Sequence, residues 1–356
     1  MCNAYSFCRV LKSWRQKQPQ RGAALMLVLL VTAIIATLAV EAQYAFTLSM
    51  ARVENRWYGA QAHEYLLGAE SLAALILEQD VENGSETDDL TEDWAQEVPP
   101  FPTDHGFLEA RLEDAQGRFN INNLNGSVQR DDNQPIVKDA LRFTPPQRQF
   151  IRLLQTFSED DEELDLSEQD AIAITEAVID WIDQDDEAMG FGGAESLYYS
   201  NLDPPYQPAN QLMNSVSELR MVRHMTPKLY KALEPFLVAL PSESDLNLNT
   251  VPAKLLRVLN NIEDLQPLDA SDVEEIITDR DVQPFDALNT FLENPIVTSL
   301  MNQPDTGNAR LGVASNYFIL HAKASIGEEQ VRFLDSILYR NDEGKARAFS
   351  RRYTSY

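Results

Sequence analysis

The densest group of side chains able to do chemistry lies between residues 180 and 195. Five carboxylates fall within eight residues, and glycines at 190, 192 and 193 then loosen the backbone before a sixth carboxylate. Clustered oxygen ligands beside flexible backbone suit calcium, which takes roughly six to eight oxygens. The predicted ligands are Asp183, Asp185, Asp186 and Glu195.

This acidic segment differs from an EF-hand. Ala188 stands six positions into a loop starting at Asp183, where an EF-hand requires glycine. A site here would therefore be irregular, with a ligand added from a distant residue. Composition alone leaves a second interpretation open, a solvated acidic loop in a very acidic chain. The other acidic run, Glu159–Glu163, lacks nearby glycines and apolar anchors, and we interpret it as solvated surface.

The other reactive residue types form no catalytic constellation. The four histidines are not paired at metal-ligand spacing, and the sequence contains neither a GxSxG motif nor a phosphate-binding glycine loop. Both cysteines, Cys2 and Cys8, lie within the first 22 residues. His321 lies in a strand pattern, which favours a structural role. The sequence therefore predicts that the protein is not an enzyme.

Charge is distributed unevenly along the 356 residues, whose formal net charge is -27. Residues 1–22 hold five basic residues and no acid, so the remainder is more acidic still. Such a body is repelled by nucleic acid and by anionic lipid headgroups. Nucleic acid is accordingly excluded as a partner.

An apolar segment follows the basic start. Residues 23–40 contain no charge, and no helix breaker appears between Ala23 and Tyr58. A helix that crosses the hydrocarbon core needs roughly 20 apolar residues. We predict one helix over 23–80, with a transmembrane part at 23–43. The preceding positive charges place the N-terminus in the cytoplasm, so a single-pass protein of the inner membrane would carry its body in the periplasm.

Three interpretations of this N-terminus compete. A cleaved secretory signal is disfavoured because no small-x-small site ends the span. An uncleaved signal anchor is the second possibility. The third is a prepilin signal, in which a basic leader, 1–22, ends at Gly22 and is cut before Ala23. Cleavage there leaves the membrane helix on the mature protein and removes both cysteines.

The body reads as α+β, with strands early and late. Residues 106–122 alternate apolar and polar residues around a turn, which predicts a hairpin, and residues 316–325 and 330–340 predict another. We therefore place parts of one sheet at 81–124 and 311–340, a helical domain at 125–310 between them, and a tail at 341–356. The helical segments expected are 145–157, 168–183, 215–222, 226–239, 252–260 and 270–280.

The helical domain contains an internal echo. Phe119–Leu124 resembles Leu246–Val251, and an amphipathic helical segment ending in an acidic turn follows each. The second unit is similar to helix–hairpin–helix or SAM-like units, some of which bind DNA. Its neighbours are largely acidic, which opposes DNA binding. We interpret it as a structural or protein-interaction unit.

The N-terminal region resembles that of the type II secretion pseudopilins, whose leader ends in a glycine that matches Gly22. Most of them carry Glu as the fifth mature residue, whereas the fifth residue after Gly22 is Leu27. That departure is typical of the general secretion pathway protein K family. Three further blocks are similar to that family and occur in the same order, namely 109–124, 180–199 and 245–256.

The resemblance implies a pseudopilin fold, in which a long N-terminal helix packs on a small antiparallel sheet and a large α-helical domain is inserted between strands. It implies a minor pseudopilin at the pseudopilus tip that initiates or caps assembly for protein export across the outer membrane. The implied partners are the minor pseudopilins of types I and J, the major pseudopilin, prepilin peptidase with N-terminal methylation, and inner-membrane lipid. It also implies calcium in the helical domain. The alternative is an uncleaved, membrane-anchored, calcium-dependent periplasmic binding module unrelated to secretion.

Overall fold

The computed structural model describes residues 21–84, 86–128, 139–158, 161–241, 243–300, 309–327 and 330–354. Except for Arg21 and Gly22, the predicted leader and both cysteines lie outside the described residues. Contacts divide the chain into two units, Met1–Ala60 and Gln61–Tyr356.

The predicted long helix is confirmed as α1, Arg21–Glu82. Its most apolar 18-residue window has a mean hydropathy of 2.8 and no buried residue, so by length and composition it can cross a membrane. The part of α1 in the second unit has a different pattern. There a stripe at helical spacing is buried, which lets this part pack on a sheet. The stripe consists of Ala62, Leu66, Ala69, Ala73 and Leu77.

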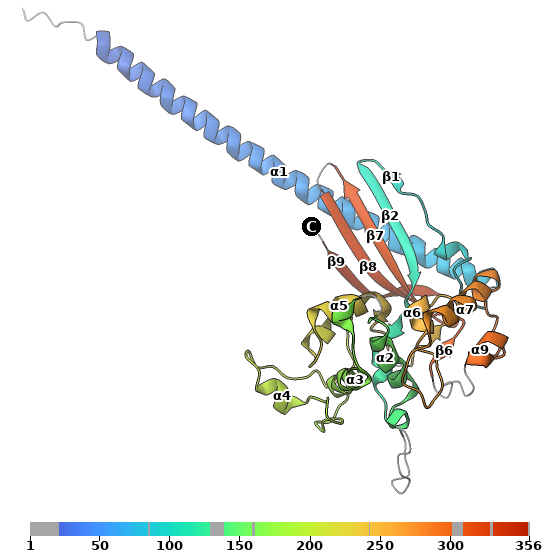
Figure 1. Ribbon diagram of the computed structural model, residues 1–356. Helices are drawn as coiled ribbons and strands as arrows, with labels where there is room; N and C mark the ends of the chain where they lie inside the picture. The colour runs from blue at the N-terminus through green and yellow to red at the C-terminus, as the bar shows by residue number, and fades with distance from the viewer. Residues whose placement is uncertain are drawn as a thin grey trace, which may run out of the picture. The chain divides into compact units, whose positions relative to one another are not determined.

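The sheet is antiparallel, with strand order β1-β2-β7-β8-β9. Its strands are β1 (Phe101–Thr103), β2 (Gly106–Asp114), β7 (Tyr317–Ile326), β8 (Gln330–Arg340) and β9 (Ala346–Thr354). Even-numbered residues of β7 and β8 face α1, where the Glu70 carboxylate accepts hydrogen bonds from Ser336 Oγ and Arg351, each at 2.7 Å. Figure 1 shows the end of α1 against this sheet and the helical region beyond one end of the strands.

Two of the expected strand assignments are wrong. Residues 106–122 do not form a hairpin: β2 pairs with β1 and β7, and after a 3₁₀ turn β3 (Phe119–Asn120) pairs in parallel with β4 (Leu237–Val238). The side chain of Asp114 accepts a hydrogen bond from Gln116 N at 2.8 Å and so stabilises the turn that leaves the sheet. Residues 341–356 are not a plain tail, because they contain β9. The second predicted hairpin is confirmed as β7–β8.

The helical region between β2 and β7 is confirmed. Its helices are α2 (Pro145–Gln155), α3 (Glu168–Ile182), α4 (Ser196–Ser200), α5 (Pro227–Leu233), α6 (Ala253–Leu256), α7 (Ala270–Val282), α8 (Leu288–Leu292) and α9 (Pro295–Leu300). Two more short strands, β5 (Leu246–Asn247) and β6 (Leu311–Gly312), pair in parallel. The 3₁₀ turns are Asp93–Ala95, Ala115–Gly117, Ile121–Leu124, Asp139–Arg142, Glu162–Leu164, Val216–Met221 and Glu234–Phe236. The helix expected at 215–222 is thus a 3₁₀ turn, and the one expected at 252–260 ends at Leu256.

The sequence echo corresponds to a repeated asparagine arrangement. Asn120 Oδ1 accepts from Asn122 N at 3.2 Å, and Asn247 Oδ1 accepts from Asn249 N at 3.0 Å. The side chain of the second asparagine of each pair then forms hydrogen bonds with both the backbone N–H and the carbonyl of one distant residue. Asn122 does so with Met213 at 2.8 and 2.9 Å, and Asn249 with Phe285 at 2.8 and 3.0 Å.

Replacing Asn122 or Asn249 with alanine is expected to destabilise the chain by about 2 kcal/mol each, because buried backbone groups lose their partners. Urea unfolding measures the change, and Asn201→Ala on the surface is the control. Equal stability of Asn122→Ala and Asn201→Ala would contradict the structural role of the repeat.

Candidate metal centre

Helix α3 delivers the first two carboxylates of the site. It starts with a capping box, in which Ser167 Oγ accepts from Asp170 N and the Asp170 carboxylate accepts from Ser167 N, each at 3.2 Å. Its apolar face is buried in the core of the helical region. Asp180 lies in its last turn and Asp183 is its C-cap. Residues three apart lie on the same side of a helix, so both side chains point to the same region.

A tight turn brings the third carboxylate back to the end of α3. Met189 N donates to both oxygens of Asp180, at 3.0 and 3.2 Å, and Gly193 N donates to Met189 O at 3.1 Å. A Cβ atom at Gly193 would lie 2.3 Å from Asp180 Oδ2, so only glycine permits this approach. Glu195 then follows as the N-cap of α4.

Asp180, Asp183 and Glu195 each offer a carboxylate oxygen, and these oxygens lie within 4.8 Å of one another. Asp180 is fully buried and Glu195 is 6% exposed. Asp183 Oδ1 and both carboxylate oxygens of Glu195 are buried, and none finds a hydrogen-bond partner among the described residues. Buried polar oxygens without partners are costly, so these atoms are suited to a ligand that the protein itself does not supply.

The electrostatics disfavour three ionised carboxylates at this place in the absence of a cation. Burial, followed by the neighbouring aspartates, raises the pKa of Glu195 to about 8. Burial likewise raises the pKa values of Asp180 and Asp183 to about 6. A divalent cation would neutralise three crowded carboxylates, and a set made only of oxygens suits calcium.

Asn210 is a candidate ligand that the sequence alone did not reveal. Its backbone N–H donates to Trp181 O and its Nδ2 donates to Asp185 O, both at 3.0 Å. Its Oδ1 is buried and has no partner among the described residues. A neutral amide oxygen therefore lies beside the loop that follows α3.

The structure brings together two of the four predicted ligands, Asp183 and Glu195. The other two are exposed and bond to backbone: Asp185 Oδ1 accepts from Glu187 N at 2.9 Å, and Asp186 Oδ1 accepts from Ser196 N at 3.1 Å. Asp180 takes a place beside Asp183 and Glu195 in the group. Its spacing of three residues from Asp183 is the sequence signal that could have identified it.

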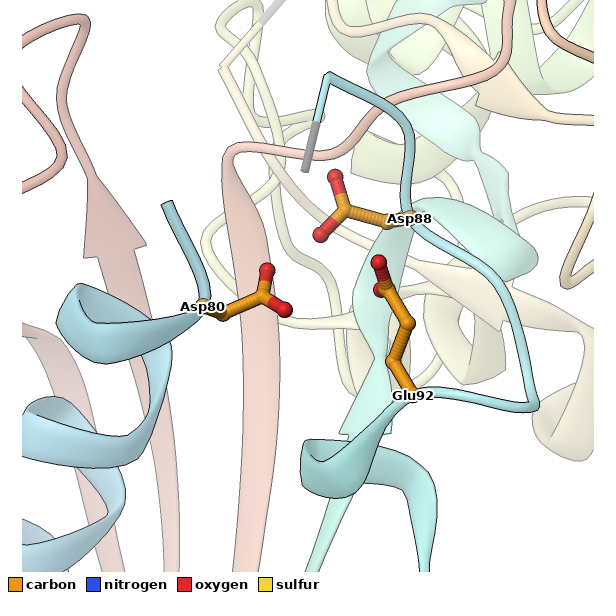
Figure 2. Close-up of side chains that lie close together, drawn as sticks. All are labelled: Asp80, Asp88 and Glu92. Carbon is orange, nitrogen blue, oxygen red and sulfur yellow. The ribbon is translucent and has the colours of Figure 1, made fainter. Parts of the chain in front are cut away.

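A second group of carboxylates lies where α1 ends. Figure 2 shows Asp80, Asp88 and Glu92 directed toward one space. Each of these carboxylates already has a partner within the protein: Arg340 binds Asp80 at 3.0 Å and both oxygens of Asp88 at 2.6 Å, and Trp94 Nε1 donates to Glu92 at 2.6 Å. Burial raises the pKa of Asp80 to about 6, and the Arg340 charge opposes this rise. We interpret this group as a structural ion pair and not as a metal site.

His321, the histidine with the strand pattern, joins neighbouring strands. Its Nδ1 lies 2.8 Å from Asp335 on β8 and its Nε2 lies 3.3 Å from Glu113 on β2. Hydrogen bonds to these carboxylates raise the pKa of His321. Its contacts fit the expected structural role.

Comparisons with known proteins agree over most of the chain. A family model described as type II secretion system (T2SS), protein K, matches residues 117–242. The chain is 32% identical to the type II secretion system protein K of Aeromonas hydrophila, over 92% of this chain and 95% of that protein. It is also 32% identical to the protein of that name from Pseudomonas aeruginosa, over 94% and 93%.

The fold has a solved counterpart. In the crystal structure of the GspK–GspI–GspJ complex from enterotoxigenic Escherichia coli, one chain matches with a TM-score of 0.70, over 86% of this chain and 100% of that chain, at 24% identity. The match confirms the long helix on an antiparallel sheet with an inserted helical region. Given identities above 30% over nearly the full length of curated relatives, the chain belongs to the type II secretion system protein K family.

Proposed function

We propose that this chain occupies the tip of the pseudopilus and initiates or caps its assembly for protein export across the outer membrane. Its family consists of minor pseudopilins, which are structural subunits, so the prediction that it is not an enzyme is confirmed. The alternative of a binding module unrelated to secretion is wrong for the same reason.

The observation that carries the tip position is Leu27. It is the fifth residue after Gly22, and it lies in the exposed apolar part of α1. The family resemblance implies that an acid at this position pairs with the N-terminal amine of the subunit ahead. A subunit without that acid has no such link to form and suits the first place in the filament. A large helical region, which would hinder stacking of further subunits above it, supports the same place.

The partners follow from this position. The solved relative was crystallised as a GspK–GspI–GspJ complex, and we propose minor pseudopilins of types I and J as partners here, with the major pseudopilin below them. The apolar part of α1 would anchor the chain in the inner membrane, with the body in the periplasm. Co-purification of the membrane-extracted chain with tagged type I and type J proteins tests the assembly. Failure to bind either protein would contradict it.

Calcium completes the proposal. Asp180, Asp183 and Glu195 would hold the ion, because they offer carboxylate oxygens within 4.8 Å of one another and those of Asp183 and Glu195 include buried atoms without a partner among the described residues. Asn210, whose buried Oδ1 also lacks such a partner, would add a neutral ligand. The bound ion would fix the end of α3 against the turn that leads to α4. In a mature chain without disulfides, such an ion would supply a cross-link.

Processing at Gly22 is expected to produce a chain that starts at Ala23, is methylated there and contains no thiol. Mass spectrometry of the protein from cells with prepilin peptidase measures the N-terminus, and thiol titration checks it independently. Gly22→Val is expected to keep the leader, whereas Gly68→Ala, elsewhere in α1, serves as the processing control. An intact Met1 in the wild-type protein would contradict the prepilin signal.

A further inference from the structure

A short turn beside the candidate metal centre holds an aromatic side chain in solvent. We call residues Met189–Gly193 the glycine turn. It is closed by the hydrogen bond from Gly193 N to Met189 O, and Phe191 lies at its centre. The Phe191 side chain is fully exposed, at 104% of its reference area.

The glycine turn is held against α3 from several sides. Gly192 N donates to Glu176 Oε2 and Arg223 Nη1 donates to Gly193 O, each at 2.8 Å. Glu176 is itself buried and accepts from Arg142 at 3.1 Å. The backbone around Phe191 is therefore fixed by contacts on both of its sides.

The glycines on either side of Phe191 allow the backbone of the turn to approach α3 closely. A Cβ atom at Gly190, where φ is +59°, would lie 2.0 Å from Glu176 Oε1, and one at Gly192 would lie 2.2 Å from Ala173 Cα. Side chains at these two positions are excluded, and the residue between them points outward. Single exposed apolar residues are common on proteins. Phe191 differs from such residues because hydrogen bonds at Gly192 and Gly193 hold the backbone beside it.

A second exposed apolar side chain lies close in sequence. Leu197, on α4, is 79% exposed. Glu195, a candidate metal ligand, precedes α4 directly. Burial of large apolar side chains such as Phe and Leu drives association, so a partner that covers Phe191 and Leu197 would gain binding energy from each.

The surrounding charge limits what can cover these residues. Residues 153–219 contain 17 acidic residues and no Lys, Arg or His, and the two arginines near the turn, Arg142 and Arg223, are engaged with Glu176 and with the Gly193 carbonyl. Asp185, Asp186 and Glu187, next to the glycine turn, are exposed. An anionic lipid surface or a nucleic acid would be repelled, whereas a protein with Lys and Arg around an apolar pocket is complementary.

We propose that Phe191 is a docking prong that inserts into an apolar pocket with a basic rim on another protein, with Leu197 as an additional apolar contact. The glycine turn presents the ring, and the acidic residues beside it orient the approach of the partner. This prong is separate from the contacts that α1 makes within a filament. The helical domain would then bind a partner protein, in addition to hindering the stacking of further subunits by its size.

The test is secretion by cells in which variants replace the wild-type chain. Phe191→Ser is expected to lower secretion at least about tenfold, because loss of a central aromatic anchor typically costs 2 kcal/mol or more of binding. Phe191→Trp, which keeps an apolar ring, is expected to retain it. Val282→Ser removes an equally exposed apolar residue (83%) on α7 and should have no effect. Normal secretion by Phe191→Ser would overturn the proposal.

Two further measurements separate this proposal from others. Phe191→Ser should melt like the wild type and still co-purify with the type I and type J proteins, so its defect differs from failure of tip assembly. Loss of that co-purification would assign Phe191 to the tip complex and overturn a separate docking role. Sedimentation with neutral phosphatidylcholine vesicles that depends on Phe191 would show a lipid-binding residue and also overturn the protein-docking proposal.

Discussion

Replacing Glu195 with glutamine is expected to abolish stabilisation by calcium and, in chelator at pH 8, to raise the melting temperature above that of the wild type. The folded pKa of Glu195 is about 8, whereas a free Glu has a pKa near 4.3. The folded state therefore binds a proton more tightly than the unfolded state does. Without metal, the contribution of Glu195 to the free energy of unfolding is fully retained below about pH 4 and is lost as the pH rises toward 8.

Bound calcium is expected to oppose this dependence in the wild type. At 100 times its dissociation constant, a ligand that binds only the folded state adds about 2.7 kcal/mol. The gain should be larger at pH 8 than at pH 5, because at pH 5 protons compete for Glu195, Asp180 and Asp183.

Melting scans with calcium or chelator at pH 5 and pH 8 measure both effects. Glu187→Gln is the matched control, since it removes an exposed carboxylate from the same segment, and it should respond to calcium like the wild type. A calcium-dependent shift that survives in Glu195→Gln would remove Glu195 from the site.

Arg340→Met is expected to lower the free energy of unfolding by about 3–5 kcal/mol, the typical cost of removing one partner of a buried ion pair. Arg340 is 7% exposed and Asp88 only 1%. The Arg340 guanidinium contacts Asp80 on α1, Asp88 in the loop that follows and the Ser315 carbonyl before β7, at 2.6–3.0 Å. Methionine would leave the Asp88 carboxylate buried without a counter-charge.

Urea unfolding of Arg340→Met against Lys345→Met measures this effect. Lys345 also pairs with an acid of α1, Glu78, at 2.9 Å, but its side chain is 60% exposed. An exposed pair contributes at most about 1 kcal/mol. Similar losses in the two variants would contradict the view that burial makes the Arg340 ion pairs stronger than the exposed Lys345–Glu78 pair.

Local sequence signals predicted the parts of the fold that depend on local contacts. The uninterrupted apolar run predicted α1, and two alternating segments around Gly327 predicted the β7–β8 hairpin. The partners of β2 could not be predicted, because Glu109 pairs with Lys323 more than 200 residues away and local alternation does not specify a distant partner. Residues 341–356 were predicted as a tail, although β9 within them pairs with β8 and Arg351 pairs with Glu70 of α1.

The candidate site was partly predictable for the same reason. Composition identified the segment that holds Asp183 and Glu195, and helical spacing would have added Asp180. Asn210 reaches the loop from 25 residues beyond Asp185 and binds backbone carbonyls there, which leaves no signature in local sequence. Residue type alone does not distinguish Asp185 and Asp186 from the candidate ligands, but their carboxylates accept hydrogen bonds from backbone N–H groups instead.

The most direct test of the tip position is gold labelling of isolated pseudopili with an antibody against the helical region. The label should appear at one end of each filament, because a chain with Leu27 and a large helical region occupies the first place only. Gold particles distributed along the filament length would contradict the account.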